Sequence, residues 1–307
     1  MDELAVRSAL EAGRRAGESY ALLRPDQTPA GLMGEQLGKG AGSSIEFMDY
    51  REYEPGDDLR RVDWSAYARS DRLMVKLHRE EVTPHLDLVV DASASMALPG
   101  TAKGEATLGL TAALACAADN ARMTRRVYAA GDRLDLMQGG EGEVAGWVWP
   151  GFGAGGRFAE AGGPGGSGGL LEALYRVAVP MRGRGVRVLV SDLLSGDDPW
   201  PVVSRLAEGA SALVVVQLLA GVDADPGGRG GWSGDVRLVD CEDGVLREVR
   251  IDAMTLRRYR ERLDQLRGQW RSACARVGAR MVEVIAEELV AGWDLRGLVR
   301  AELLRMV

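Results

Sequence analysis

The sequence predicts an α/β protein with a doubly wound, mostly parallel sheet and an N-terminal β-rich appendage. Short, continuously apolar segments such as 86–90 and 186–190 are typical of strands that are buried on both faces. Segments with helical periodicity separate these strands, and an alternation of strands and helices indicates βαβ units. We place the boundary where this alternation begins, with residues 1–84 forming the appendage and residues 85–307 forming the α/β domain.

The appendage is expected to contain an amphipathic helix over 2–23 and two strands, over 45–53 and 72–82, in which apolar and polar residues alternate. A charged segment from Tyr53 to Arg69 lies between the strands. Its Pro-Gly pair predicts a turn, and Trp64 is expected to anchor a short helix. We favour a packed network of ion pairs over a binding surface for this segment, because mixed charge with one aromatic residue suits internal pairing.

The α/β domain is expected to begin with the strand 86–90 and to end with a helix. A hairpin with its turn at Asp243-Gly244 precedes the longest helix. The expected strands are 86–90, 126–130, 133–137, 186–190, 212–219 and 280–285, and the expected helices are 102–121, 170–181, 200–208, 253–277 and 294–305.

Composition excludes several classes of function. A net charge of -7 argues against nucleic-acid binding, which needs a basic face. The N-terminal residues mix Asp, Glu and Arg among apolar residues and so lack the uncharged h-region of a signal peptide. No segment reaches about 18 uncharged apolar residues, so we expect no membrane span and a cytoplasmic location. The three cysteines are far apart, which predicts neither a disulfide framework nor a zinc site.

Oxygen-bearing side chains follow two of the predicted buried strands. Asp91, Ser93 and Ser95 come directly after the strand 86–90, and Asp192 follows the strand 186–190. Ligands of open α/β sheets collect at the carboxyl ends of the strands, so these side chains are candidates for one site. Their hard oxygens suit Mg²⁺, or alternatively Mn²⁺ or Ca²⁺. Asp and Ser are also common turn formers and helix caps, and this structural interpretation stays open.

The first third of the chain resembles a known bacterial family. The residues from Arg51 to Trp64 read REYEPGDDLRRVDW, and Ala68-Arg69, Glu80-Glu81 and the run from Asp91 to Met96 follow in order. This pattern is similar to the signature of the family called domain of unknown function 58. The resemblance implies a von Willebrand factor A-like fold, and it implies a MoxR-type AAA+ ATPase, or its client, as the partner.

The resemblance also implies a metal-ion-dependent adhesion site. Ser93 and Ser95 would bind the metal directly, whereas Asp91 and Asp192 would act directly or through water. Such sites take a further threonine, and the corresponding position here is Gly168. Either Ser167 substitutes for the threonine or one metal ligand is missing.

The sequence therefore predicts a non-enzymatic adaptor that docks an acidic residue of a partner protein on its metal ion, since it nominates no acid/base pair. Two alternatives stay open. One is a metal-dependent hydrolase that uses the same loop. The other is a structural assembly protein whose metal site is vestigial.

Overall fold

The chain forms two compact units in the computed structural model, which describes residues 1, 3–23, 47–78, 84–131, 133–137, 169–177, 180–241 and 244–307. One unit combines Met1–Thr28 with Pro84–Val307, and the other is Pro29–Thr83. The expected division at residue 84 placed the N-terminal helix in the appendage. In the structure this helix, α1 (Glu3–Gly17), packs along α3 (Lys103–Asn120), so it belongs to the α/β unit. The contact is so close that a Cβ atom at Gly13 would overlap the backbone of Gly109.

The α/β unit is built on a six-stranded sheet in which the edge strand β6 is antiparallel and all other neighbours are parallel. This arrangement confirms the predicted fold class. In spatial order the strands are β11 (Arg280–Ile285), β8 (Ala212–Leu219), β7 (Val186–Ser191), β4 (His85–Asp91), β5 (Thr124–Ala130) and β6 (Leu134–Leu136).

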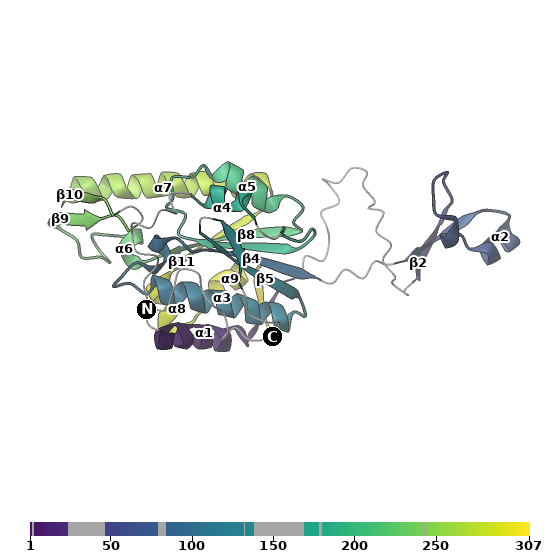
Figure 1. The fold of residues 1–307 in the computed structure, drawn as a ribbon, viewed down its shortest axis with the longest axis horizontal. Helices are drawn as coiled ribbons and strands as arrows, with labels where there is room; N and C mark the ends of the chain where they lie inside the picture. Colours follow the sequence, from purple (N-terminus) through teal and green to yellow (C-terminus); the bar gives the residue numbers. More distant parts are fainter. Residues whose placement is uncertain are drawn as a thin grey trace. The chain divides into compact units, whose positions relative to one another are not determined.

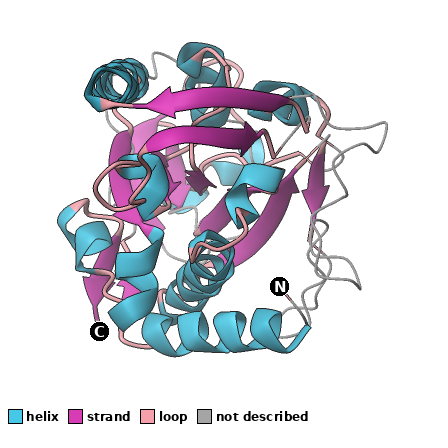
Figure 2. Ribbon diagram, turned by 90° about the vertical axis from the view of Figure 1, so that its left-hand side faces the viewer, coloured by secondary structure: helices cyan, strands magenta, loops and turns pink. Residues whose placement is uncertain are grey.

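Helices cover both faces of this sheet because its strands are apolar on both sides. Every residue of β4 is buried. Leu88 and Val90 face a core that includes α1, α3 and α8 (Ala286–Gly292), whereas Val89 faces a second core. The second core is closed by α4 (Leu170–Tyr175), α5 (Pro199–Ala207) and α7 (Ala253–Arg276). Figures 1 and 2 show these two helical layers with the strands between them.

The order of the strands reverses beside β4. The chain runs from β4 outward to β5 and β6, then returns to the other side of β4 and continues through β7, β8 and β11. In doubly wound sheets such a reversal opens a crevice at the carboxyl ends of the two central strands. Asp91 ends β4, and Asp192 directly follows β7, so both lie at this switch point.

The remaining elements of this unit are small. They are β1 (Tyr20–Leu22), η2 (Ala94–Ala97), α6 (Gly221–Ala224), the hairpin β9 (Gly234–Val239) and β10 (Leu246–Ile251), α9 (Arg296–Arg300) and β12 (Leu304–Met306). The expected single helix over 294–305 is wrong, because this segment forms the short helix α9 and then β12, which pairs antiparallel with β1. No helix in the described part of the chain is long and apolar enough to cross a membrane.

The second unit pairs β2 (Phe47–Glu52) with β3 (Met74–His78), and η1 (Leu59–Arg61) and α2 (Trp64–Ser70) lie between these strands in sequence. Asp63 caps α2 and also accepts a hydrogen bond from the Tyr50 hydroxyl at 2.7 Å. Arg51 pairs with Asp57 at 2.6 Å, so internal ion pairing is present as expected. The expected anchoring by Trp64 is wrong, because 59% of this residue is exposed. It follows Asp63 directly at the start of α2, where its ring meets the ring of Tyr67 on the same helix edge to face.

Candidate functional site

A hydrogen bond joins the ends of the two central strands. Asp91 is buried, and its Oδ2 atom accepts a hydrogen bond of 2.6 Å from the hydroxyl of Ser191, the last residue of β7. Its Oδ1 atom accepts from the backbone N–H of Ser93 at 2.9 Å. The Ser191 oxygen in turn accepts from the N–H of Leu193 at 3.0 Å. The Asp91 carboxylate is therefore held in a fixed orientation at the switch point.

The two serines of the loop after β4 lie side by side. The hydroxyl oxygens of Ser93 and Ser95 are 3.1 Å apart. Ser93 immediately precedes η2, but its side chain makes no capping hydrogen bond to that helix. The helix-cap interpretation therefore does not account for Ser93, and the two hydroxyls form a pair next to the Asp91 turn.

Asp192 combines a turn with an ion pair. Its Oδ1 atom accepts a hydrogen bond from the N–H of Leu194 at 3.0 Å, which forms the kind of turn that aspartate favours. Leu193 between them has a left-handed backbone with φ of 59°, which is uncommon for a residue other than glycine. The Oδ2 atom of Asp192 points instead to Lys103, whose ammonium nitrogen lies 2.7 Å away.

Lys103 is the residue of this site that sequence reasoning missed. It is the first residue of α3, it is only 1% exposed, and its ammonium bridges Asp192 and Asp223. Burial acts to lower the pKa of Lys103, but the charges of Asp192 and Asp223 outweigh burial and the pKa is raised. A signal existed in the composition: the chain has three lysines among its 38 basic residues. Lysine supplies a compact point charge where the planar arginine fork would need more room.

Negative charge exceeds positive charge in this cluster. Burial, together with the negative charge of Asp192, raises the pKa of Asp91 to about 6, although the hydrogen bonds from Ser191 and Ser93 act in the opposite direction. The cluster contains three carboxyl groups, those of Asp91, Asp192 and Asp223, and one ammonium group, that of Lys103. The single ammonium group of Lys103 therefore balances only part of the negative charge that these carboxylates can carry.

The predicted residues Asp91, Ser93, Ser95 and Asp192 thus lie at one edge of the sheet, while Ser167 and Gly168 fall outside the described residues. Within the described ranges, no group of three or more carboxylate, imidazole or thiol side chains could hold a metal ion. A cation here would depend on serine hydroxyls as well as carboxylates. That donor set consists of hard oxygens and fits Mg²⁺ or Mn²⁺.

His85 has a structural role in the core. It lies at the opposite end of β4 from Asp91, and its Nε2 atom is 3.0 Å from Asp87. Its Nδ1 atom is 2.7 Å from the Thr124 hydroxyl. Both ring nitrogens are therefore satisfied within the core, away from the switch point.

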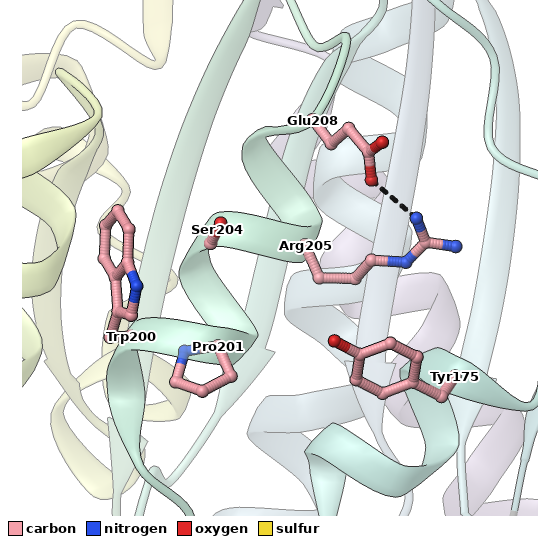
Figure 3. Close-up of a pocket in the computed structure, with 6 residues that line it drawn as sticks. All are labelled: Tyr175, Trp200, Pro201, Ser204, Arg205 and Glu208. Atoms are coloured by element: carbon pink, nitrogen blue, oxygen red, sulfur yellow. Dashed lines mark hydrogen bonds and ion pairs between the residues drawn. The ribbon is translucent and has the colours of Figure 1, made fainter.

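A separate groove of about 440 Å³ lies along α4 and α5. Figure 3 shows the guanidinium of Arg205 between Glu208 and the ring of Tyr175; it pairs with Glu208 at 2.6 Å and lies 5.9 Å from the centre of the ring. Asp91, Ser93, Ser95 and Asp192 do not line this groove, and the Glu208 carboxylate in it is already paired with Arg205. The lining residues are Tyr175, Trp200, Pro201, Ser204, Arg205 and Glu208.

Comparison with known proteins places the chain within one family. Residues 49–269 match the sequence profile described as "Protein of unknown function DUF58". Among similar proteins are the uncharacterized protein Mb1516 of Mycobacterium bovis and the uncharacterized protein Rv1480 of Mycobacterium tuberculosis. Each is 30% identical over 233 residues, which cover 72% of this chain and 68% of the relative. A solved structure, the conserved hypothetical protein BatB from Bacteroides thetaiotaomicron, aligns over 71% of this chain and 98% of its own, with a TM-score of 0.37 and 11% identity.

Proposed function

The chain belongs to the family described as protein of unknown function DUF58, and we propose that it is a metal-dependent protein-binding protein. A divalent cation at the switch point would supply an open coordination position for an Asp or Glu side chain of a partner. The observation that carries the proposal is the pair of buried carboxylates, Asp91 and Asp192, whose charge Lys103 only partly balances. A charge-assisted contact in such a crevice can dominate an interface.

The hydroxyls of Ser93 and Ser95 support the same proposal. They lie 3.1 Å apart beside Asp91 and are neutral, so they can bind a cation without cancelling its charge. An ion held by neutral hydroxyls and few carboxylates keeps much of its attraction for a further anion. Asp91 and Asp192 would fix the ion and its water molecules through oxygens that the strand ends already orient.

The contacts favour binding over hydrolysis. A metal-activated water needs a general base that can accept a proton. Lys103 is held in its charged form by two carboxylates and cannot accept one, and the proposal assigns the carboxylates of Asp91 and Asp192 to holding the ion. By resemblance of the family signature, we propose a MoxR-type AAA+ ATPase, or its client, as the partner that supplies the acidic residue.

The proposal is tested by capturing partners from native lysate with tagged wild type and Asp91→Asn, each in Mg²⁺ and in EDTA. Asp235→Asn is the matched control, because Asp235 lies on the exposed hairpin strand β9. We expect a partner that is retained by wild type and by Asp235→Asn in Mg²⁺ only. Retention that is equal for all three proteins in both buffers, with the variants folded, would exclude metal-dependent docking at this site.

A further inference from the structure

Lys103 places a positive charge inside the site that the proposed function assigns to a divalent cation. We infer that Lys103 competes with this cation for Asp192 and thereby sets the affinity of the site for metal. The inference rests on the proposed function and adds Lys103 to it, a residue that does not itself bind the metal ion. Its basis is the geometry of one ammonium group between two carboxylates.

The competition follows from where the Lys103 ammonium lies. It is 2.7 Å from Oδ2 of Asp192, and Oδ1 of the same carboxylate is engaged by the N–H of Leu194. Each oxygen of Asp192 therefore already has a donor. A cation that uses Asp192, directly or through a water molecule, must share this carboxylate with the ammonium group of Lys103. The two positive charges would then repel each other, and burial strengthens this repulsion. Metal binding is therefore weakened by the presence of Lys103.

Asp223 keeps Lys103 in place and gives it an alternative partner. Oδ2 of Asp223 lies 2.9 Å from the ammonium and also accepts a hydrogen bond from the N–H of Ala220 at 3.0 Å. The backbone oxygen of Asp223 accepts from the Tyr259 hydroxyl at 2.5 Å, which ties α6 to α7. When a cation draws Asp192 toward itself, Lys103 retains Asp223. The contact with Asp223 therefore limits the free-energy cost of metal binding. Removing the charge of Lys103 should strengthen metal binding, whereas removing the charge of Asp223 should weaken it.

Two substitutions separate competition from simple structural support. Lys103→Gln keeps a hydrogen-bond donor beside Asp192 but removes the competing charge. Asp223→Asn keeps an acceptor for the N–H of Ala220 but leaves Lys103 dependent on Asp192 alone. We expect Lys103→Gln to bind Mn²⁺ at least tenfold more tightly than wild type, and Asp223→Asn to bind it at least threefold more weakly.

The experiment is calorimetric titration of the purified full chain with Mn²⁺, with thermal unfolding recorded in EDTA and in Mn²⁺ for each protein. A merely structural role would lower the unfolding temperature of both variants without moving their Mn²⁺ affinities in opposite directions. Equal affinities in all three proteins overturn the competition and leave the proposed metal site intact. If neither wild type nor any variant binds Mn²⁺ at millimolar concentration, both this inference and the proposed function fail. Should Lys103→Gln not fold, Asp223→Asn decides: weaker binding supports the competition, and equal or tighter binding refutes it.

Discussion

Neutralising Asp91 is expected to stabilise the metal-free protein while removing its capacity for metal. Asp91 is buried beside Asp192, and its pKa is raised from 3.8 to about 6 by burial and by that neighbouring charge. The native state therefore binds the Asp91 proton more tightly than the unfolded chain does. Stability that comes from this proton is complete below pH 3.8 and is lost as the pH rises through 6, so the ionised carboxylate destabilises the fold at neutral pH.

The magnitude follows from the two pKa values. At about 1.4 kcal/mol for each tenfold change in proton affinity, the ionised Asp91 costs about 3 kcal/mol at pH 7.5 and about 1 kcal/mol at pH 4.5. Asparagine keeps the carbonyl oxygen that accepts from the N–H of Ser93, but it gives up a charge-assisted bond from Ser191. We therefore expect Asp91→Asn to raise the free energy of unfolding by about 1–3 kcal/mol at pH 7.5.

Urea unfolding of wild type and Asp91→Asn in EDTA, at pH 7.5 and at pH 4.5, measures this difference. Asp192→Asn is the matched comparison and should be destabilising by about 1–3 kcal/mol, because it removes a carboxylate partner of the buried Lys103. The reasoning is refuted if Asp91→Asn is less stable than wild type at pH 7.5, or if its advantage does not shrink at pH 4.5.

Three further predictions concern the rest of the fold. Gly13→Ala should lower the free energy of unfolding by about 2 kcal/mol, because a Cβ atom would overlap the backbone of Gly109, whereas Gly183→Ala, in open space, should change it by less than about 0.5 kcal/mol in the same urea assay. Trp64→Ala should also stay within about 0.5 kcal/mol, since its side chain is exposed; a loss above about 1 kcal/mol would mean that Trp64 is covered. Cys274, whose pKa is raised to about 11 by burial, should react with a thiol reagent at pH 8 only after unfolding, and rapid labelling of the native protein would contradict its burial.

The strand ends of the site could be predicted from the sequence because the signal there is local. Apolar segments mark the two central strands, and the polar residue that follows each strand must emerge at the carboxyl edge of a parallel sheet. Asp91 and Asp192 were therefore identified without knowledge of contacts. The sequence does not determine that the Ser191 hydroxyl donates a hydrogen bond to Asp91, because this contact joins two different strands.

Lys103 could not be predicted in the same way because its role depends on tertiary contacts. It starts a helix that is rich in alanine and leucine, and its partners come from the end of β7 and from α6. The amphipathic pattern of α1 likewise predicts a helix but not the surface that it covers. Only the packing of α1 on α3 shows that the N-terminal helix belongs to the α/β unit rather than to the appendage.

The pairing of β1 with β12 affects how the chain reaches its native state during synthesis. Leu22 and Leu304 are register partners, so β1 must wait for a segment that is made much later. Until then α1, with its buried Leu10, lacks part of the surface that covers it in the native unit. Contacts between residues so far apart in sequence form slowly, because a long loop must be closed first. The N-terminal helix can thus dock on α3 early, but β1 stays without its partner strand until β12 has been made, so this part of the domain is completed late.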